Sequence, residues 1–383
     1  MEKKMRTIFR AEQSRAEQSR AEQSRAEQSR AEQSRAYDLL RVIATILVVI
    51  GHCTYFKIST RYGGCDYSYL FINKSYSFKI LNKLTEFIYI FHMPLFIALS
   101  GALFEKSLSK GNYSLFIRLL KKKSENLLIP FGVVTVFYAV PIKFISGYFN
   151  QSKRIVRDIL VGQILIQGNT YLWYLLTLYA IFIIAYFIER TIKIKQTILL
   201  LFLIILSIVS GKIDIKLVSY ICQFGLWFYV GMLFEEYRIF FEKKFVSIKK
   251  MLFRADIILL IIYTIFSYNL ISFPAKLVFS ILKIILAGLL CLTTYMIAYF
   301  ASESWIMELK IFNIFRRDSF GIYLYSDPLN YTILMIGATL FGGKIWSNDI
   351  YSISFYLFRF FFTLGISILV TELLRKCKVK YIC

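Results

Sequence analysis

The sequence predicts an all-α integral membrane protein with about ten transmembrane helices. Of its 383 residues, 57% are hydrophobic, 17% aromatic and only 19% charged, and the mean hydropathy is +0.57. The apolar residues come in blocks of roughly 15–25 separated by short basic stretches, and a helix of that length crosses a hydrocarbon core of ~30 Å. This composition excludes a soluble globular domain, a disulfide-stabilised scaffold and a disordered protein.

The first element is a repetitive segment. Residues 11–35 contain five perfect copies of Ala-Glu-Gln-Ser-Arg. A step of five residues turns a helix by about 500°, so successive copies cannot share one face. This pattern excludes a coiled coil and an amphipathic membrane helix. Residues 1–36 are therefore predicted to be a cytoplasmic tail that the fold does not need.

Ten apolar blocks are expected to form one transmembrane domain over residues 37–373, followed by a short basic tail, 374–383. The predicted spans are 37–56, 84–104, 126–148, 171–188, 196–210, 217–234, 255–273, 276–301, 319–341 and 351–373. The third and eighth blocks are long and contain Pro141 and Lys283, so an eleventh span stays open.

The basic residues predict the orientation of these spans. The N-terminal tail, the C-terminal tail and the alternate loops, among them 105–125 and 235–254, hold 31 of the 47 Lys and Arg residues, against 12 on the other side. Lys and Arg collect on the cytoplasmic side of membrane proteins. Both termini are therefore expected in the cytoplasm, with the protein in a bacterial plasma membrane. This placement also explains the net charge of +23 without nucleic-acid binding.

The first predicted span carries polar residues on one face. Arg41 and His52 are eleven residues apart, about 1100° of rotation, and so lie within about 20° of one line. Thr45 lies on the same stripe, and Asp38 lies about one turn below Arg41. A charge inside a span is costly and needs a reason. The alternative is that Arg41 reaches the cytoplasmic interface and His52 caps the opposite end.

The second span contains His92, the other histidine of the chain. Pro94 frees a backbone carbonyl, and Gly101 permits close approach of a neighbouring helix, so a kinked and tightly packed span is expected. His92 is a candidate for binding substrate. The alternative is a structural hydrogen bond to the freed carbonyl.

Other polar residues in the spans are weaker candidates. Lys143 is expected to reach the interface, whereas Arg359 is deep in the last span and is expected to have a buried partner. Trp173 can stack on a sugar ring or belong to an interfacial aromatic belt. Tyr323 and Asp327 are candidates for substrate contact. The six cysteines have no CxxC spacing, so no metal site is predicted.

These motifs resemble the acyltransferase-3 family of integral membrane O-acyltransferases, and its fucose 4-O-acetylase-like branch in particular. The resemblance rests on Arg41 and His52 with ten residues between them, and on Phe91-His92-Met93-Pro94-Leu95-Phe96 with Ser100-Gly101. Looser matches, in the same order as in the family, are Leu172-Trp173-Tyr174-Leu175, Trp227-Phe228-Tyr229-Val230-Gly231 and Ser319-Phe320-Gly321-Ile322-Tyr323-Leu324.

The resemblance implies transfer of an acyl group, usually acetyl, from cytoplasmic acetyl-CoA to a hydroxyl of a cell-envelope carbohydrate or its lipid-linked precursor. No permanently bound cofactor is implied, because acetyl-CoA is a co-substrate. His52 is then the general base or a transient acyl carrier. Arg41 attracts the CoA phosphates, and Asp38 orients Arg41.

One departure from the family is expected to matter. Many members carry a histidine near the position where this chain has Ser326-Asp327-Pro328. Ser326 or Asp327 is therefore a candidate to replace it as a polar group.

Two other classes of function are open from the residues alone. A transporter that exports acyl groups or glycolipids often shows two halves with matching broken helices, and the prolines here show no such pairing. A structural subunit of a polysaccharide assembly complex has no need of the charged stripe on the first span.

The repeat also suggests regulation at the level of DNA. The pentanucleotide GAGCA, repeated in tandem, encodes Glu-Gln-Ser-Arg-Ala and returns to frame every five residues, as residues 11–35 require. Slippage by one unit shifts the frame before the first span. The repeat is thus predicted to be a phase-variation switch, and the alternative is a protein-level linker expanded by recombination.

Overall fold

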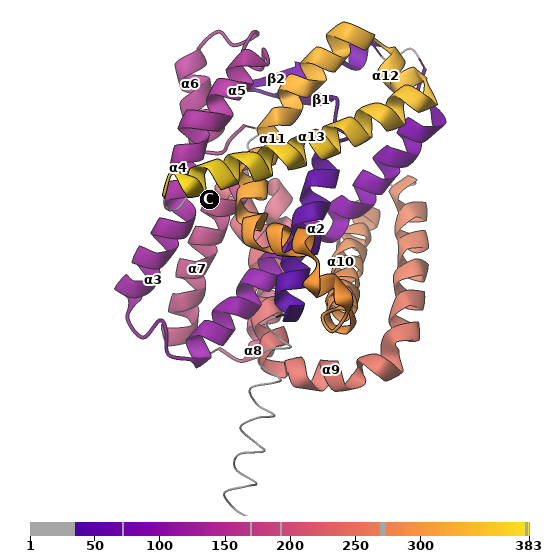
Figure 1. Cartoon of the computed structure of the whole chain (residues 1–383). Coiled ribbons are helices and arrows are strands. Elements are labelled where there is room, and N and C mark those ends of the chain that lie inside the picture. Colours follow the sequence, from indigo (N-terminus) through magenta and orange to yellow (C-terminus); the bar gives the residue numbers. More distant parts are fainter. Residues whose placement is uncertain are drawn as a thin grey trace, which may run out of the picture.

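A computed structural model of the chain describes residues 35–70, 73–168, 171–191, 194–268, 273–379 and 382. The predicted Ala-Glu-Gln-Ser-Arg repeat lies outside the described residues, except for Arg35. The described part is a bundle of helices with a small β-hairpin at the end opposite the start of the first helix (Figure 1).

The first helix covers residues 35–52. It leads into an antiparallel hairpin of β1 (Lys57–Thr60) and β2 (Gly63–Asp66), and the long helix α2 (Tyr76–Ser109) follows. The hairpin departs from the all-α fold that we predicted. Two features of the loop after the first helix favour the hairpin. Thr60, a β-branched residue, ends β1 beside the turn, and Gly63 has a φ of 120°, a backbone conformation that favours glycine.

The segment from 116 to 145 is one helical path with two π-helical turns, Ser124–Leu128 and Thr135–Ala139. Each precedes a proline, Pro130 or Pro141. Proline has no N–H and its ring crowds the preceding turn, so a widened turn keeps the segment helical.

The other elements follow in chain order. They are α3 (Phe116–Lys123), α4 (Ile129–Val134), α5 (Val140–Ile145), α6 (Ile155–Ile159), α7 (Trp173–Thr191), α8 (Gln196–Val209), α9 (Lys216–Tyr268), α10 (Phe273–Ala301), α11 (Lys310–Phe341), α12 (Lys344–Ser347) and α13 (Asp349–Lys376). A π-helical turn, Leu160–Ile164, extends α6. Short 3-10 turns lie at Ser68–Leu70, Ser210–Lys212 and Trp305–Glu308.

Five of the described helical segments are long and apolar enough to cross a membrane. They are Tyr76–Ser109, Phe116–Ile145, Trp173–Thr191, Leu277–Ala301 and Asp349–Lys376. The protein therefore has membrane-spanning helices, and the number of about ten stays a prediction.

One expected loop is helical in the structure. We predicted separate spans at 217–234 and 255–273, with a basic loop at 235–254, whereas α9 runs unbroken from Lys216 to Tyr268 and curves along the lower edge of the molecule (Figure 1). The reason is local. The stretch 235–254 has no Gly or Pro, and Arg238 pairs with Glu235 and Glu242 at helical spacing.

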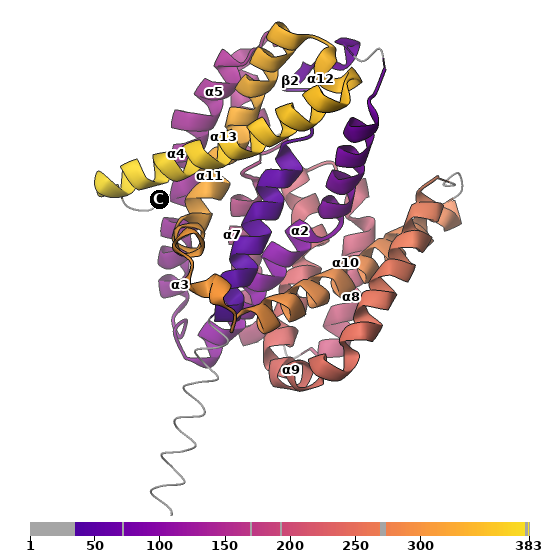
Figure 2. The same ribbon diagram turned by 45° about the vertical axis from the view of Figure 1, so that its right-hand side comes forward.

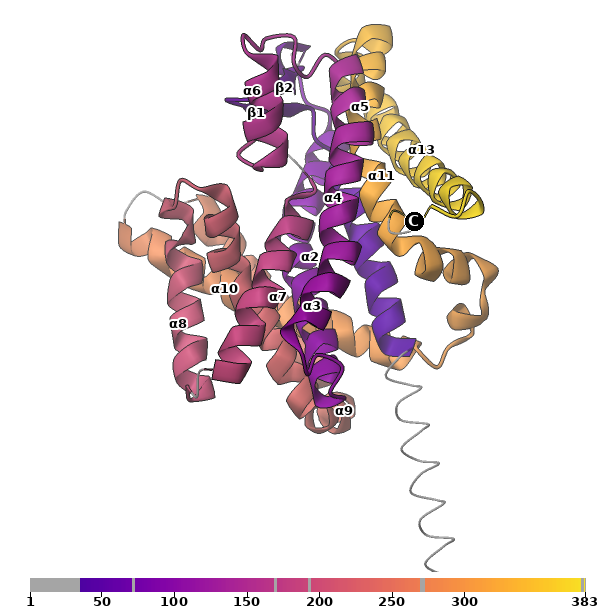
Figure 3. The same cartoon turned by 90° about the vertical axis from the view of Figure 1, so that its left-hand side faces the viewer.

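The helices form two groups around a central layer. In Figure 3, α8 and α10 lie on one side, α11 and α13 on the other, and α2, α4 and α7 between them. Figure 2 shows α10 running beside the C-terminal part of α9.

Two glycines allow α2 and α9 to touch through their backbones. A Cβ atom at Gly101 would lie 2.0 Å from the carbonyl oxygen of Phe228, and one at Gly231 would lie 1.9 Å from that of Ala98. Any side chain at either position would force the helices apart. The close approach expected at Gly101 is therefore present, with Gly231 as its counterpart.

Candidate functional site

Two of the predicted site residues, His52 and Asp327, come from different helices and contact each other. His52 is the last residue of the first helix, and Asp327 lies in the middle of α11. Nδ1 of His52 is 2.8 Å from Oδ1 of Asp327; the side chain of His52 is 18% exposed and that of Asp327 is 3% exposed. Asp327 also accepts a hydrogen bond from the Tyr55 hydroxyl. Both contacts are made by Oδ1 of Asp327, whereas its buried Oδ2 has no hydrogen-bond partner among the described residues.

Pro328 alters α11 next to Asp327. Because proline cannot donate to the carbonyl four residues earlier, the carbonyl of Leu324 is free, and it accepts a hydrogen bond of 2.6 Å from the Tyr171 hydroxyl. The carbonyl of Tyr325 accepts one of 2.8 Å from Tyr138. These two tyrosines hold the proline-containing turn from which Asp327 projects.

Arg359 of α13 fixes the end of the first helix. Its guanidinium donates to the carbonyl oxygens of Tyr55 (2.9 Å) and His52 (3.2 Å) and to Oδ1 of Asn330 (3.0 Å). The last carbonyls of a helix have no partners inside it, so a buried arginine satisfies them here. The expectation of a buried partner for Arg359 is confirmed.

His92 lies near His52 but does not touch Asp327. It is buried, and its Nδ1 is 2.8 Å from the carbonyl oxygen of Ile88. The ring of Tyr89 packs edge-on against both imidazoles, with centroids 4.8 Å from His92 and 6.5 Å from His52. His92 therefore makes a structural hydrogen bond, to Ile88 rather than to the carbonyl that Pro94 frees.

A polar cavity of about 510 Å³ lies beside the first helix. Three arginines line it: Arg41 of the first helix and Arg316 and Arg317 of α11. Asp38 connects two of them, because its carboxylate oxygens are 3.7 Å from Arg41 and 3.4 Å from Arg316. A cavity with three guanidinium groups is suited to phosphate.

Two residues of the cavity lining belong to the helices that carry His52 and Asp327. They are Thr45 of the first helix and Tyr323 of α11. Thr45 precedes His52 by two turns of the first helix, about 10 Å, and Tyr323 precedes Asp327 by one turn of α11, about 6 Å. The cavity and the His52–Asp327 pair therefore lie along the same two helices, and neither His52 nor Asp327 belongs to the cavity lining. Arg41 and His52 do not contact each other.

Two of the predicted residues have other partners. The hydroxyl of Tyr323 donates to the carbonyl of Tyr171 at 2.8 Å, although its side chain lines the cavity. Trp173 lies away from the cavity lining, with its ring 4.4 Å from that of Tyr220 and 4.9 Å from that of Phe224. A contact of either residue with substrate stays a prediction.

The predicted position of Lys143 at the membrane interface is wrong. We expected it to reach the interface, but its side chain is fully buried. Its Nζ donates to Oε1 of Gln163 at 2.8 Å and lies over the rings of Tyr148 and Tyr331 at 4.8 and 5.1 Å. Pro141 widens the preceding helix and turns Lys143 inward, where two aromatic faces and one amide replace water.

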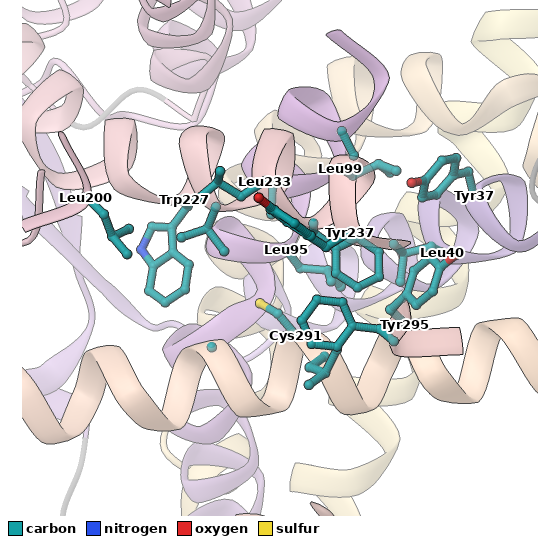
Figure 4. Close-up of a pocket in the computed structure, with 18 of the residues that line it drawn as sticks. Tyr37, Leu40, Leu95, Leu99, Leu200, Trp227, Leu233, Tyr237, Cys291 and Tyr295 are labelled. Atoms are coloured by element: carbon teal, nitrogen blue, oxygen red, sulfur yellow. The ribbon is translucent and has the colours of Figure 1, made fainter. Parts of the chain in front are cut away.

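A second cavity, of about 560 Å³, is apolar. It lies between the first helix, α2, α8, α9 and α10 (Figure 4). The hydroxyls of Tyr37 and Tyr295 donate to Glu235 and Glu242, so the rings present carbon to the cavity. None of the predicted site residues lines it. It suits hydrocarbon rather than phosphate or sugar.

Several residues of the site were not predicted from the sequence. Tyr55 gave no signal, because it lies at the end of the predicted span 37–56 and belongs to no motif. Arg316 and Arg317 gave one: they stand as a pair before the Ser319-Phe320-Gly321 motif, with only Asp318 between them and the motif. Their charge entered only the prediction of orientation.

Comparison with known proteins identifies the family of the chain. A family model described as an acyltransferase domain matches residues 34–372, which include the first helix, the arginine-lined cavity and the His52–Asp327 pair. In the comparisons with curated proteins and with solved structures, no match is found. Because the family model covers most of the chain, the protein belongs to the acyltransferase-3 family of membrane acyltransferases.

Proposed function

We propose that this acyltransferase moves an acetyl group from cytoplasmic acetyl-CoA to a hydroxyl of a cell-envelope carbohydrate or its lipid-linked precursor. The observation that carries the proposal is the contact between His52 and Asp327, together with a cavity lined by three arginines beside the same helix. The His52–Asp327 pair suits proton transfer, and the cavity suits a phosphorylated donor.

The Asp327 carboxylate gives His52 the form that a general base needs. A carboxylate accepts the Nδ1–H hydrogen, so the lone pair is on Nε2. Nε2 removes the proton of the acceptor hydroxyl while its oxygen attacks the thioester carbon. Asp327 stabilises the imidazolium that forms. The C–S bond then breaks, and the CoA thiolate takes the proton from Nε2.

In this proposal the donor, acetyl-CoA, enters through the arginine-lined cavity. Arg41, Arg316 and Arg317 bind the phosphates of CoA, and the extended phosphopantetheine arm reaches along Thr45 toward His52. Arg41 and His52 are about 16 Å apart along the helix. The extended phosphopantetheine arm is long and narrow enough to bridge a distance of this order.

His52 can also act as an acyl carrier. In that route Nε2 attacks the thioester, the C–S bond breaks, the CoA thiolate takes up the proton that the imidazole loses from Nδ1, and an acetyl-imidazole forms. The acceptor hydroxyl then takes the acetyl group and gives its proton back to the imidazole. The two routes differ in a measurable way: only the carrier route incorporates label from acetyl-CoA into the protein before acceptor is added.

The proposal includes an orientation of the protein in the membrane. We place both termini and the arginine-lined cavity on the cytoplasmic side of a bacterial plasma membrane, where acetyl-CoA is available. The hairpin then lies on the outer side. The acceptor approaches His52 from there, so donor and acceptor meet from opposite sides of the membrane.

The proposal is tested with purified protein in detergent. The protein is mixed with acetyl-CoA carrying ¹³C in the acetyl group and with de-O-acetylated envelope polysaccharide, and NMR follows the O-acetyl methyl signal. A transporter, the alternative function, gives no product in detergent, because no second compartment exists. Appearance of the labelled O-acetyl signal is the expected result, and its absence with folded protein contradicts the proposal.

A further inference from the structure

A polar cleft of about 380 Å³ opens at the hairpin end of the molecule. Its walls are β1, β2 and the segment 151–158, which enters α6; Figure 3 shows these elements together. The charged residues of its lining are Arg61, Asp66, Lys153, Arg154, Arg157 and Asp158. None of these residues takes part in the proposed reaction or in the proposed binding of acetyl-CoA.

The acidic groups of the cleft are already paired. Asp66 is 2.7 Å from Nζ of Lys57, and this contact, with hydrogen bonds from Ser68, lowers the pKa of Asp66 to about 2. Asp158 accepts a hydrogen bond of 2.5 Å from Ser152 and pairs with Arg157 at 2.9 Å. Both contacts lower its pKa. The carboxylates are thus ionised and neutralised in place.

Within the described ranges, the other cations of the cleft form no ion pair at contact distance, although Arg154 also helps to lower the pKa of Asp158. Arg61, Lys153 and Arg154 are exposed, and none of them forms an ion pair with a carboxylate in the part of the chain that the structure describes. The cleft therefore carries uncompensated positive charge from two separate segments.

Membrane orientation does not explain these cations. In the orientation proposed above, the hairpin side carries only 12 of the 47 Lys and Arg residues, and the positive-inside tendency acts against placing them there. Yet Arg61, Lys153 and Arg154, from two loops far apart in sequence, line one cleft. A local function at the cleft accounts for their position better than topology does.

The cleft is fixed to the helices of the site. The N–H of Gly64 donates to the carbonyl of Tyr148 at 2.8 Å, and the ring of Tyr148 packs 5.6 Å from that of Tyr331. Tyr331 follows Asp327 by one turn of α11, and its ring is 6.1 Å from that of Tyr55. The hairpin wall is therefore built on the residues that surround Asp327.

We propose that this cleft binds a carboxylate-bearing sugar residue of an anionic envelope polysaccharide and holds the acceptor beside the His52–Asp327 pair. Arg61 and Arg154 offer planar guanidinium groups to a carboxylate, and the amide of Gln151 offers hydrogen bonds to hydroxyls. The hydroxyls of Ser152 and Thr60 already donate to Asp158 and to the carbonyl of Gly63, so they can only accept further hydrogen bonds. The role as an acceptor subsite rests on the proposed function, whereas the binding of acidic sugar does not.

The test uses the full chain in nanodiscs of phosphatidylcholine. Isothermal titration compares an oligogalacturonate with a neutral glucan oligosaccharide of the same length. We expect the acidic oligosaccharide to bind at least about tenfold more tightly, and Arg61→Gln and Arg154→Gln each to weaken it about tenfold. Lys344→Gln is the matched control, because Lys344 is exposed on the same side but outside the cleft.

Three results would overturn the inference. They are equal affinity for the two oligosaccharides, an equal loss of affinity in Lys344→Gln, and displacement of the oligogalacturonate by an equal concentration of glycerol phosphate, which would assign the cleft to a lipid headgroup. The failure of acyl transfer is a separate result, because the titration contains no acetyl-CoA. Binding without transfer would remove the proposed function and keep the cleft.

Discussion

Asp327 of α11 directs a carboxylate oxygen to Nδ1 of His52 at 2.8 Å, although the two residues lie near opposite ends of the chain. The contact needs two further elements. Pro328 opens α11 at this turn, and Arg359 of α13 binds the carbonyl of His52 at 3.2 Å. The position of one imidazole therefore depends on three helices, and its free Nε2 is the atom that the proposed reaction uses.

The first prediction concerns the donor. Arg41→Ala is expected to raise the KM for acetyl-CoA about tenfold, because a charge-assisted contact to phosphate is lost. Arg41→Lys is expected to recover part of this loss, because a point charge still attracts phosphate but lacks the bidentate fork. Initial rates at varied acetyl-CoA provide the measurement.

Arg254→Ala is the control for this prediction. Arg254 is exposed on α9 and lies outside the arginine-lined cavity. If Arg254→Ala raises the KM as much as Arg41→Ala does, general surface charge attracts the donor and the cavity has no special role.

The second prediction concerns His92. Because His92 is buried and binds the carbonyl of Ile88, His92→Ala is expected to reduce the free energy of unfolding by about 1–3 kcal/mol and to lower activity only in part. Thermal unfolding and specific activity are measured on the same preparation. A stable His92→Ala protein without turnover would instead assign His92 to the reaction.

The third prediction concerns the contact of α2 with α9. Gly101→Ala and Gly231→Ala are each expected to lower the thermal midpoint strongly, because overpacking costs about 1–3 kcal/mol even where side chains can yield, and here the clash is with backbone. Gly365→Ala in α13 is the matched control, since a Cβ there meets nothing within 4 Å. Equal midpoints for all three variants would argue against the close contact.

The fourth prediction concerns the repeat at 11–35, which we propose is a phase-variation switch. Sequencing of the gene is expected to find a strict GAGCA tract whose copy number differs between clones, with the acyl modification only in clones that keep the frame. In-frame deletion of the repeat is expected to leave the enzyme active. Scattered synonymous codons in the tract would exclude slippage.

The membrane-spanning character of the protein and two of the site residues, Arg41 and His52, could be predicted from the sequence. Hydropathy marked the apolar helices, and the eleven-residue step marked Arg41 and His52 on one face. Asp327 was predicted as a candidate for substrate contact and, with Ser326, as a candidate to replace the histidine of other family members. Its partnership with His52 depends on how α11 packs against the first helix, and no local pattern encodes that packing.

The errors have physical causes as well. Basic composition suggested a loop at 235–254, but ion pairs such as Arg238–Glu242 at 2.6 Å support a helix there. Lys143 was assigned to the interface from its place near a span end. Its burial depends on the rings of Tyr148 and Tyr331, which reach it only through tertiary packing.

The most direct test of the account is the initial rate of ¹³C-acetyl transfer to polysaccharide by purified His52→Ala and Asp327→Asn proteins. We predict no transfer by His52→Ala. For Asp327→Asn we predict a kcat lower by about 10²–10⁴-fold, with the KM for acetyl-CoA within about twofold of the original value, because Asp327 lies outside the arginine-lined cavity. Both proteins must keep the thermal midpoint of the original. Transfer at the original rate by folded His52→Ala would contradict the account.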